Sequence, residues 1–306
     1  MDNFANKVAV VTGAGSGMGR YIAVLLAKMG CNVAICDVNE ETLADTHAML
    51  RHYNVATSRH IVDIGDKGAI DEFYETVINQ HEHVDLVFNN AGITIMSEFA
   101  DMPENEWDRV MDVNFHGVIN MTRKFLPHLQ SRPDAALVNT SSIFGMVAVP
   151  TQSVYHATKF AVRGFTESLV KEMRGSKLQV HCVHPGHVGT NIAASAKQIE
   201  SNDAGDKKPA FFGRDISWEQ QGELFRDNGM HPSRAAEIIL NGVRKKKSRI
   251  FVGWDAKLID LAQRLLPRHY DKLFPLIFIP MLLVNRVLKK PLTELPQEPR
   301  KPQSKP

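Results

Sequence analysis

Tyr155, Lys159 and Ser142 are side chains that could move a proton and hold charge in a single site. Lys159 follows Tyr155 by four residues, so a helix would place both on one face, although most such pairs are merely solvated. A phenol with its ordinary pKa of about 10 is a poor acid or base at neutral pH. The ammonium of Lys159 favours the phenolate, and the Ser142 hydroxyl can hold a substrate oxygen that develops charge. This set predicts proton transfer at an alcohol or carbonyl group.

A glycine-rich segment near the start of the chain offers a site for a diphosphate. It lies between an apolar run at residues 7–12 and a helical pattern at 21–27, and its glycines are Gly13, Gly15, Gly17 and Gly19. Glycines before a helix N-terminus let backbone N–H groups approach phosphate closely, and the helix dipole favours negative charge. Any tight turn uses glycine, but the position inside a β-α-β unit predicts dinucleotide binding.

Asp37 indicates which dinucleotide is bound. It ends the second expected strand, 18 residues after Gly19, where a carboxylate accepts ribose hydroxyls and repels a 2′-phosphate. Ser16, inside the glycine turn, carries no positive charge that would pair with such a phosphate. Asn39 or Glu40 can cap the following helix, so capping does not require Asp37. NAD is therefore expected as the cofactor, and NADP is disfavoured.

Short apolar runs alternate with helical patterns along the chain. The expected strands cover residues 7–12, 32–37, 55–62, 84–88, 135–140, 178–184 and 249–252. The expected helices cover residues 21–27, 40–52, 66–80, 104–130 and 153–174, and one more follows Pro232. Continuous apolar strands between helices indicate a sheet covered on both faces. The predicted fold class is α/β, a doubly wound (Rossmann) parallel sheet of about seven strands with a substrate lid and a C-terminal helical extension.

The expected domain organisation has three parts. Residues 1–255 form the NAD-binding catalytic domain, in which the periodicity fails between about 190 and 231 and predicts a substrate lid. Residues 256–288 form a basic, apolar helical extension, and the Pro- and Lys-rich residues 289–306 form a disordered tail.

Apolar side chains of the lid and of the segment after Ser142 could line a substrate cavity. They are Phe144, Val149, Phe211, Phe212, Trp218, Leu224 and Phe225. For any one of these, a place in the core beneath the lid is the competing interpretation. Together they favour a hydrophobic secondary alcohol or ketone as substrate, and neither a nucleic acid nor a metal ion is expected in the site.

The charge of the chain is unevenly distributed. Residues 244–290 carry 12 Lys or Arg against 3 Asp or Glu, whereas the net charge of the whole chain is only +2. Within this basic part, the apolar run at 273–284 is too short to cross a bilayer, which needs about 20 residues, and two prolines interrupt it. We expect either peripheral contact of residues 256–290 with an anionic membrane or packing on a partner subunit.

The cysteines and the first residues suggest a compartment. Cys31, Cys36 and Cys182 lack the spacing of a metal site or a disulfide framework, which fits a reducing environment. The chain enters its first strand without a basic, apolar leader. A cytoplasmic protein is expected.

Taken together and in this order, the motifs resemble those of the short-chain dehydrogenase/reductase family over about residues 5–255. The matching segments are Thr12–Gly19, which includes Met18, then Asp63-Ile64, Asn89-Asn90-Ala91-Gly92, Asn114, Ser142, Tyr155-His156-Ala157-Thr158-Lys159 and Pro185-Gly186-His187-Val188-Gly189-Thr190. The spacing of thirteen residues to Tyr155 favours Ser142 over its neighbour Ser141. His156 should face away from the reacting side, so we expect it at the surface or in an interface.

The resemblance implies a role for each matched residue. Asp63 and Ile64 would contact the adenine, Asn90, Ala91 and Gly92 would lie near the ribose, and Pro185, Gly186, Val188 and Thr190 would bind the nicotinamide carboxamide. Asn114 would interrupt a long helix and hold a water in a proton relay behind Lys159. Tyr155 and Lys159 would also bind the cofactor, whose positive oxidised ring would further favour the phenolate.

Partners and substrates follow from the same resemblance. The helices at 104–130 and 153–174 resemble those through which family members form homodimers or homotetramers. Basic, apolar extensions resemble those of members that act on steroids, retinoids or other hydrophobic alcohols. The alternatives are an NADPH-dependent reductase of smaller carbonyl compounds and a non-catalytic NAD-binding scaffold at a membrane surface.

Overall fold

The computed structural model describes most of the chain. The described residues are 3–192, 195–199, 223, 225–273, 288–292 and 294–296. The predicted lid residues Phe211, Phe212, Trp218 and Leu224, and nearly all of the apolar run at 273–284, lie outside these ranges.

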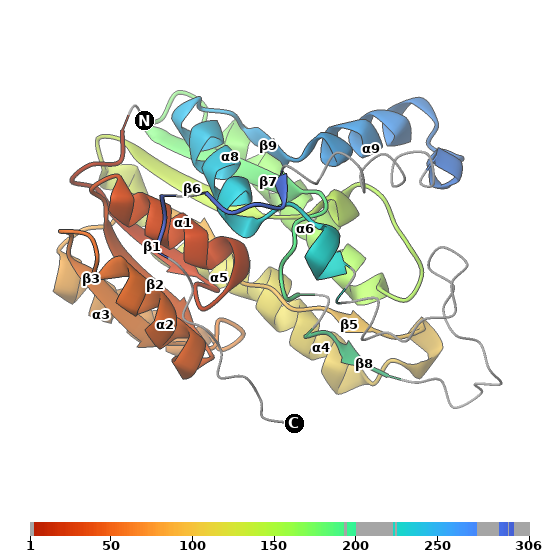
Figure 1. Cartoon of the computed structure of the whole chain (residues 1–306), viewed down its shortest axis with the longest axis horizontal. Coiled ribbons are helices and arrows are strands. Elements are labelled where there is room, and N and C mark those ends of the chain that lie inside the picture. Colours follow the sequence, from red (N-terminus) through yellow and green to blue (C-terminus); the bar gives the residue numbers. More distant parts are fainter. Residues whose placement is uncertain are drawn as a thin grey trace.

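Seven parallel strands form the central sheet (Figure 1). They are β1 (Val8–Thr12), β2 (Asn32–Asp37), β3 (Thr57–Ile61), β4 (Leu86–Asn89), β6 (Ala135–Thr140), β7 (Leu178–Pro185) and β9 (Arg249–Val252). Their order across the sheet is β3-β2-β1-β4-β6-β7-β9. The predicted doubly wound parallel sheet of about seven strands is confirmed. From β1 the strands are added outward on one side, and from β4 they are added outward on the other side. Ligands of such sheets bind at this switch point, at the carboxyl ends of the strands.

Helices cover both faces of the sheet, as the continuous apolar strands require. On one face pack α1 (Gly17–Lys28), α2 (Glu40–Leu50) and α8 (Pro232–Arg244). On the other pack α3 (Lys67–His81), α5 (Gly117–Ser131) and α6 (Ser153–Glu172). All five residues of β1 and all six of β6 are buried. Alternate residues of each strand therefore enter two separate cores.

The helix expected at residues 104–130 is interrupted, as the resemblance implied. It comprises α4 (Glu104–Met111), a π-helical turn η2 (Asp112–His116) and α5. The π-helical turn widens the helix by one residue and leaves local backbone groups open to other partners. Asn114 lies in this turn and is fully buried.

Smaller elements join the sheet to the lid and to the C-terminal part. A second sheet pairs β5 (Ile95–Met96) with β8 (Lys197–Gln198), which lies in the expected lid. After β9 come α9 (Trp254–Leu265) and a 3-10 turn η5 (Tyr270–Leu273), at the upper right of Figure 1. Two further 3-10 turns are η1 (Phe99–Asp101) and η3 (Ile143–Gly145). Within the described ranges, no helix is long and apolar enough to cross a membrane.

The described part of the C-terminal tail differs from the disordered segment expected from residue 289. Leu292 and Leu295 pack against the core beneath α1 and α8. Lys28 of α1 pairs with Glu294 at 2.8 Å, and the Leu292 N–H donates to the Ser233 hydroxyl at 3.1 Å. Leu292 and Leu295 are partly buried, so two leucines in a Pro- and Lys-rich context attach this short stretch to the core, a contact that composition alone does not predict.

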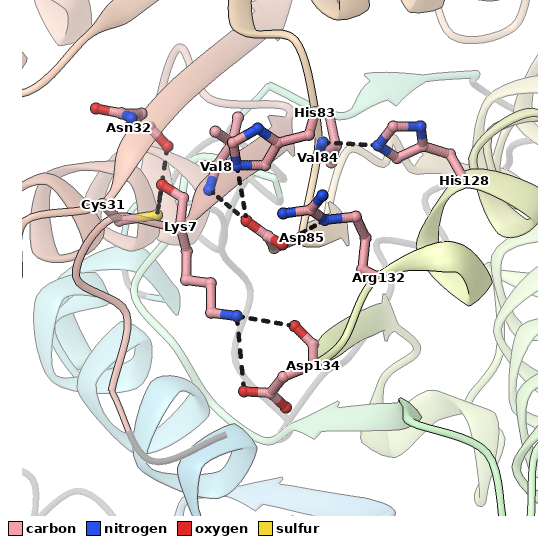
Figure 2. A network of polar contacts seen from close by, with 10 residues as sticks. All are labelled: Lys7, Val8, Cys31, Asn32, His83, Val84, Asp85, His128, Arg132 and Asp134. Atoms are coloured by element: carbon pink, nitrogen blue, oxygen red, sulfur yellow. Dashed lines mark hydrogen bonds and ion pairs between the residues drawn. The ribbon is translucent and has the colours of Figure 1, made fainter.

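A polar network joins the amino ends of the strands (Figure 2). The buried Asp85 carboxylate, just before β4, accepts hydrogen bonds from the Val8 N–H at 3.0 Å and from Arg132 Nε at 2.8 Å. His83 Nε2 lies 3.4 Å from the same carboxylate. Lys7, just before β1, donates to the Asp134 carbonyl at 3.1 Å. These contacts tie the starts of β1, β4 and β6 together.

Candidate active site

The glycine turn between β1 and α1 leaves its backbone open to a ligand. Gly13 and Gly17 have φ values of +63° and +53°, a region that strains residues with a side chain. A Cβ on Gly13 would lie 2.6 Å from Cα of Ala91, so the turn and the segment after β4 need glycine to approach each other. The helix N-terminus at Gly17 then directs free N–H groups toward the cavity beside it.

Thr12 and Asn90 lock this turn to the segment after β4. The Thr12 hydroxyl accepts hydrogen bonds from the backbone N–H groups of Asn90 at 3.0 Å and Ala91 at 3.1 Å. In return, Nδ2 of Asn90 donates to the Thr12 carbonyl at 3.1 Å. The two predicted cofactor segments are therefore one rigid unit at the carboxyl ends of β1 and β4.

Asp37 lies at the carboxyl end of β2 and faces the same turn. Its carboxylate accepts hydrogen bonds from the Gly15 N–H at 2.9 Å and the Asn39 N–H at 3.0 Å. Asn39, rather than Asp37, caps α2 by accepting from the Thr42 N–H at 2.9 Å. A carboxylate has further lone pairs for ligand hydroxyls. Capping thus does not explain Asp37, as the sequence predicted.

An open cavity runs along these carboxyl ends. Its described lining residues are Gly13, Ser16, Gly17, Met18, Cys36, Asp37, Val38, Val62, Asp63, Ile64, Asn90, Ala91, Gly92, Ile93, Arg109, Val113, Thr190, Asn191, Ile192 and Ser195. Among them Arg109 is the one Lys or Arg, and it pairs with Asp63 at 2.8 Å. Most of the predicted cofactor residues are therefore brought together around one cavity whose positive charge is already paired.

Arg20 is a functional residue that the sequence analysis missed. It lies buried in α1, directly beneath the glycine turn. Its guanidinium donates to the Gly15 carbonyl and, at 3.0 Å, to the Thr46 hydroxyl, so it supports the turn from behind. A basic residue just before an expected helix is usually exposed to solvent, and only the hydrogen bond to the buried Thr46 of α2 explains why Arg20 is buried.

Ser142, Tyr155 and Lys159 meet beside this cavity. Ser142 follows β6, and its hydroxyl is close enough to the Tyr155 phenol of α6 to act on the pKa of that phenol. Lys159 Nζ lies 5.5 Å from the centre of the Tyr155 ring and donates to the Thr140 carbonyl at 3.1 Å. The Ser141 hydroxyl points elsewhere and donates to the Lys159 carbonyl at 2.8 Å. The spacing argument for Ser142 over Ser141 therefore agrees with the geometry.

Burial controls the pKa values of this pair. It raises the pKa of Tyr155 to about 12, although the hydrogen bond with Ser142 acts in the opposite direction. It lowers the pKa of Lys159 to about 8. Both shifts have one cause, since a site with little water disfavours the charged form of either group. The sequence predicted that the Lys159 cation, together with an oxidised nicotinamide ring, would favour the phenolate; in the chain by itself, burial is the main influence on the pKa of Tyr155.

Asn114 connects the π-helical turn to the catalytic helix. Its Oδ1 accepts from the Ile93 N–H at 2.8 Å, and its Nδ2 donates to the Ile93 carbonyl at 2.8 Å and to the Thr158 hydroxyl at 3.2 Å. A Cβ built on Gly92 would lie 3.2 Å from Oδ1 of Asn114 and 3.3 Å from Nζ of Lys159. Because Gly92 has no side chain, Asn114 Oδ1 and Lys159 Nζ both border the small space that such a Cβ would fill.

Comparison with known proteins agrees with this arrangement. The family model described as short chain dehydrogenase matches residues 7–201. The chain belongs to the short-chain dehydrogenase family. A relative named as an oxidoreductase, SadH of Mycobacterium tuberculosis, is 37% identical over 280 residues, which cover 89% of this chain and 95% of that protein.

Two solved structures resemble this short-chain dehydrogenase. One, a short-chain dehydrogenase/reductase of Burkholderia phymatum in complex with NAD, has a TM-score of 0.72 and 25% identity, and covers 96% of this chain and 100% of its own. The other, a metagenomic short-chain oxidoreductase in complex with NADP, has a TM-score of 0.64 and 23% identity, and covers 81% of this chain and 97% of its own. Both nucleotides occur among similar structures, so the likeness alone does not choose between them.

The predicted nicotinamide segment of this short-chain dehydrogenase follows β7. Thr190 lines the cavity, whereas Pro185 and Val188 are buried behind it. Gly186 donates its N–H to the Val252 carbonyl at 2.9 Å, and Val188 bridges to Met230. The segment is thus held between β9 and the residues that precede α8.

Asp255 is the second residue that sequence reasoning missed. It is buried at the start of α9 and accepts a hydrogen bond from the His187 N–H at 2.6 Å. Burial raises the pKa of Asp255 above its ordinary value, while the backbone N–H groups of His187 and Ala256 act against that rise. An acidic residue directly after the last strand is the signal that could have found it, because carboxyl ends of parallel strands share one edge.

The predicted apolar wall is partly described. The Phe144 ring meets that of Tyr155 edge to face, with centres 6.4 Å apart, so this wall residue lies next to the phenol. Phe225 is the one lid aromatic within the described residues, and its ring packs on His187 at 4.2 Å. Of the described wall residues, Phe144 therefore lies beside the phenol of Tyr155, and Phe225 lies beside His187.

Proposed function

We propose that this short-chain dehydrogenase oxidises hydrophobic secondary alcohols with NAD, or reduces the matching ketones, with Tyr155 as general base and acid. The observation that carries the proposal is the meeting of Ser142, Tyr155 and Lys159 at the carboxyl edge of the sheet. They lie beside a cavity lined by glycines whose places a Cβ would fill and by Asp37, a carboxylate that pairs with no Lys or Arg among the described residues. This donor set fits a dinucleotide better than any ligand without phosphate and ribose.

Each predicted cofactor residue has a place in this proposal. Gly13, Ser16, Gly17, Met18 and Gly19 would hold the diphosphate, Asp37 the adenosine ribose, and Asp63 and Ile64 the adenine. Asn90, Ala91, Gly92, Tyr155 and Lys159 would hold the nicotinamide ribose, and Pro185, Gly186, Val188 and Thr190 the carboxamide. Bound NAD supplies the hydride acceptor for alcohol oxidation, and NADH the donor for the reverse reaction.

Side chains of this protein would transfer the proton between the substrate and solvent. Tyr155 takes the proton of the substrate hydroxyl during oxidation and returns it during reduction, while Ser142 holds the same oxygen. Because burial raises the pKa of Tyr155 to about 12, the phenolate needs nearby positive charge, which Lys159 and the oxidised nicotinamide would provide together. Lys159 and a water held by Asn114 then connect the phenol to solvent.

Three features support NAD over NADP. Asp37 would repel a 2′-phosphate, and Arg109 is already paired with Asp63. Arg20, the nearby cation beneath the glycine turn, is directed at backbone carbonyl oxygen and does not line the cavity. A reductase that uses NADPH remains the rival within enzymes, and a non-catalytic NAD-binding scaffold is the rival of another class.

The test is NADH formation with a panel of hydrophobic secondary alcohols. Tyr155→Phe should lower kcat by about a thousandfold, the size expected when a general base is removed. Tyr53→Phe, which removes a phenol far along the chain from the catalytic helix, is the matched control and should keep its turnover. Full turnover in Tyr155→Phe would disprove the assigned base. NAD binding without turnover on any alcohol or ketone would favour the scaffold.

We also propose that residues 256–290 contact an anionic membrane surface. In α9, Leu258, Leu261 and Leu265 form an outward stripe with exposed fractions of 43%, 50% and 69%, and the cations of Lys257 and Arg264 lie along one side of it. Flotation with anionic vesicles should recover the protein, and Leu261→Ser with Leu265→Ser should reduce recovery. Equal recovery with neutral vesicles would show that binding does not require an anionic surface, which contradicts the proposal.

We also propose a homo-oligomer that pairs through the helices at 104–130, which are α4 and α5, and at 153–174, which is α6. Phe160 of α6 is 43% exposed, an unusual position for a phenylalanine on a helix that also packs on the sheet. Light scattering should give a dimer or tetramer, and Phe160→Glu should shift it toward the monomer. A monomeric wild type would contradict this proposal without touching the proposed reaction.

A further inference from the structure

His156 is buried beside the proposed general base. It follows Tyr155 in α6, and the sequence predicted a surface or interface position for it. In the structure only 6% of the residue is exposed, so that expectation is wrong. The reason is that the segment after Ser142 folds back over the first turn of α6 and supplies partners for both ring nitrogens.

Two hydrogen bonds determine the state of the imidazole. Nδ1 lies 2.6 Å from the Gln152 carbonyl oxygen, which only accepts, so Nδ1 carries the proton. Nε2 lies 3.0 Å from the Val149 backbone N–H, which only donates, so Nε2 must keep its lone pair. Burial lowers the pKa of His156, which agrees with a neutral ring near neutral pH. The His156 ring thus joins Val149 to the start of the catalytic helix.

Phe144 connects the imidazole to the phenol. The rings of His156 and Phe144 are stacked, with centres 4.9 Å apart and an interplanar angle of 29°. The Phe144 ring also contacts the Tyr155 ring, edge to face, with an interplanar angle of 86°. One imidazole therefore contacts both residues, Phe144 and Val149, that the sequence assigned to the apolar wall after Ser142.

The same segment has additional anchors that do not involve Tyr155 directly. The Ala148 N–H donates to the Tyr270 hydroxyl at 3.2 Å, and the Ser97 N–H donates to the Thr151 carbonyl at 2.9 Å. Thr151 has a φ of +66°, a conformation that costs energy in a residue with a branched side chain. A strained segment held from several sides has a defined position, and His156 sets that position relative to the phenol.

We propose that His156 is a positioning residue that fixes Phe144 and Val149 as the wall against which the apolar part of the substrate packs. This inference rests on the proposed oxidation of hydrophobic alcohols. It adds a determinant of substrate affinity that touches neither the cofactor nor the reacting atoms.

Three substitutions separate the contacts of the ring. In His156→Gln, the amide oxygen can occupy the place of Nε2 and accept from Val149. In His156→Asn, the shorter amide can reach only the Gln152 side, so the Val149 N–H loses its acceptor. His156→Phe removes both hydrogen bonds and keeps a ring to stack on Phe144. His52→Phe, at an exposed histidine after α2, is the matched control.

For each variant we would measure three constants: KM for a hydrophobic alcohol, KM for NAD, and kcat. The comparison shows whether the substitution changes the affinity for the alcohol alone. His156→Asn and His156→Phe should raise KM for the alcohol about tenfold, the size expected for a buried N–H left without its acceptor. KM for NAD should stay within twofold, and His156→Gln should restore most of the affinity for the alcohol. Unchanged KM for the alcohol in the Asn and Phe variants would overturn the proposal, as would a parallel rise in KM for NAD.

A spectroscopic measurement keeps the inference separate from the proposed reaction. Nitrogen-15 spectra of the histidine rings of wild type at neutral pH should show His156 as the neutral tautomer protonated at Nδ1. An Nε2-protonated or cationic ring would overturn the proposal whether or not the protein oxidises any alcohol. If the tautomer is as expected and no alcohol is turned over in wild type, the proposed function fails and the inference built on it fails with it.

Discussion

Asp85 and Asp255 are buried aspartates at opposite edges of one sheet, and their partners differ. Asp85, at the amino edge, is surrounded by the side chains of Arg132 and His83 and by the Val8 N–H (Figure 2). Asp255, at the carboxyl edge, accepts from backbone N–H groups at the start of α9 and from His187. The Asp85 carboxylate is compensated mainly by the guanidinium of Arg132, and the Asp255 carboxylate mainly by backbone N–H groups.

The difference separates what holds the fold from what positions the site. The Asp85 network ties three strands together before they enter the core, and none of its members lines the cofactor cavity. Asp255 is attached to the segment that carries Thr190 into that cavity. Substitutions at the amino edge should therefore change stability, and substitutions at the carboxyl edge should change binding and turnover.

Asp85→Ala should give the largest effect. It leaves Arg132 and the Val8 N–H without their acceptor in a buried place, which costs about 4 kcal/mol of unfolding free energy. Urea unfolding followed by circular dichroism measures this loss. Asp71→Ala, at an exposed carboxylate paired with Lys67 and Lys124, is the control and should change stability far less. Equal losses in both variants would mean that the amino-edge network has no special role.

The pH dependence of stability gives the next largest effect. Burial lowers the pKa of His181 in β7 to about 4. Below its unfolded pKa of about 6.5, the unfolded chain binds this proton and the folded chain does not, so stability present above that pH is lost as the pH falls toward 4. The shift corresponds to about 3 kcal/mol. His181→Gln should flatten the unfolding free energy between these pH values, and an unchanged slope would rule out His181 as a main cause.

Asp37→Ala should shift the cofactor preference at the carboxyl edge. Removing the carboxylate ends its repulsion of a 2′-phosphate and its bonds to ribose hydroxyls, so the ratio of NAD to NADP affinity should fall about thirtyfold, or about 2 kcal/mol. Calorimetric titration with each nucleotide measures the ratio. Asn39→Ala removes the cap of α2 and serves as the control for indirect effects on this loop. A ratio that moves equally in both variants would remove Asp37 as the selector.

Asp255→Asn should give the smallest effect. The amide oxygen can still accept from His187, but the negative charge at the start of α9 is gone, and KM for NAD should rise about tenfold, or about 1.4 kcal/mol. Asp260→Asn, on the same helix and paired with Arg264, is the matched control. Should Asp255→Asn lower stability as much as Asp85→Ala, the proposed division between the two edges would be wrong.

The elements of the sheet could be predicted because their signals are local. Continuous apolar runs gave the strands of the sheet, and the glycines before Tyr21 gave the turn beside the cavity. The order of motifs also placed Asn114 at a break in a helix, which the π-helical turn confirms. These features depend on neighbouring residues, so the sequence contains the information in readable form.

Features that depend on distant partners or on the path of an irregular segment could not be predicted. The acceptor role of Asp255 requires His187, and the burial of His156 requires a segment that returns over α6. The pKa of Tyr155 depends on how much water the folded chain removes, which motif spacing does not express. The short pairing of β5 with β8 likewise has no local signal, since each strand has only two residues.

The segment from Asp255 to Tyr270 touches both halves of the proposed reaction. Asp255 accepts a hydrogen bond from the His187 N–H beside the expected carboxamide site. Tyr270 accepts one from the Ala148 N–H, in the segment proposed to contact the alcohol. A movement of the whole segment from α9 to η5 would consequently change the proposed cofactor side and the proposed substrate side together. A ligand that bound the exposed leucines of α9 and moved this segment would therefore alter the proposed turnover without entering the site.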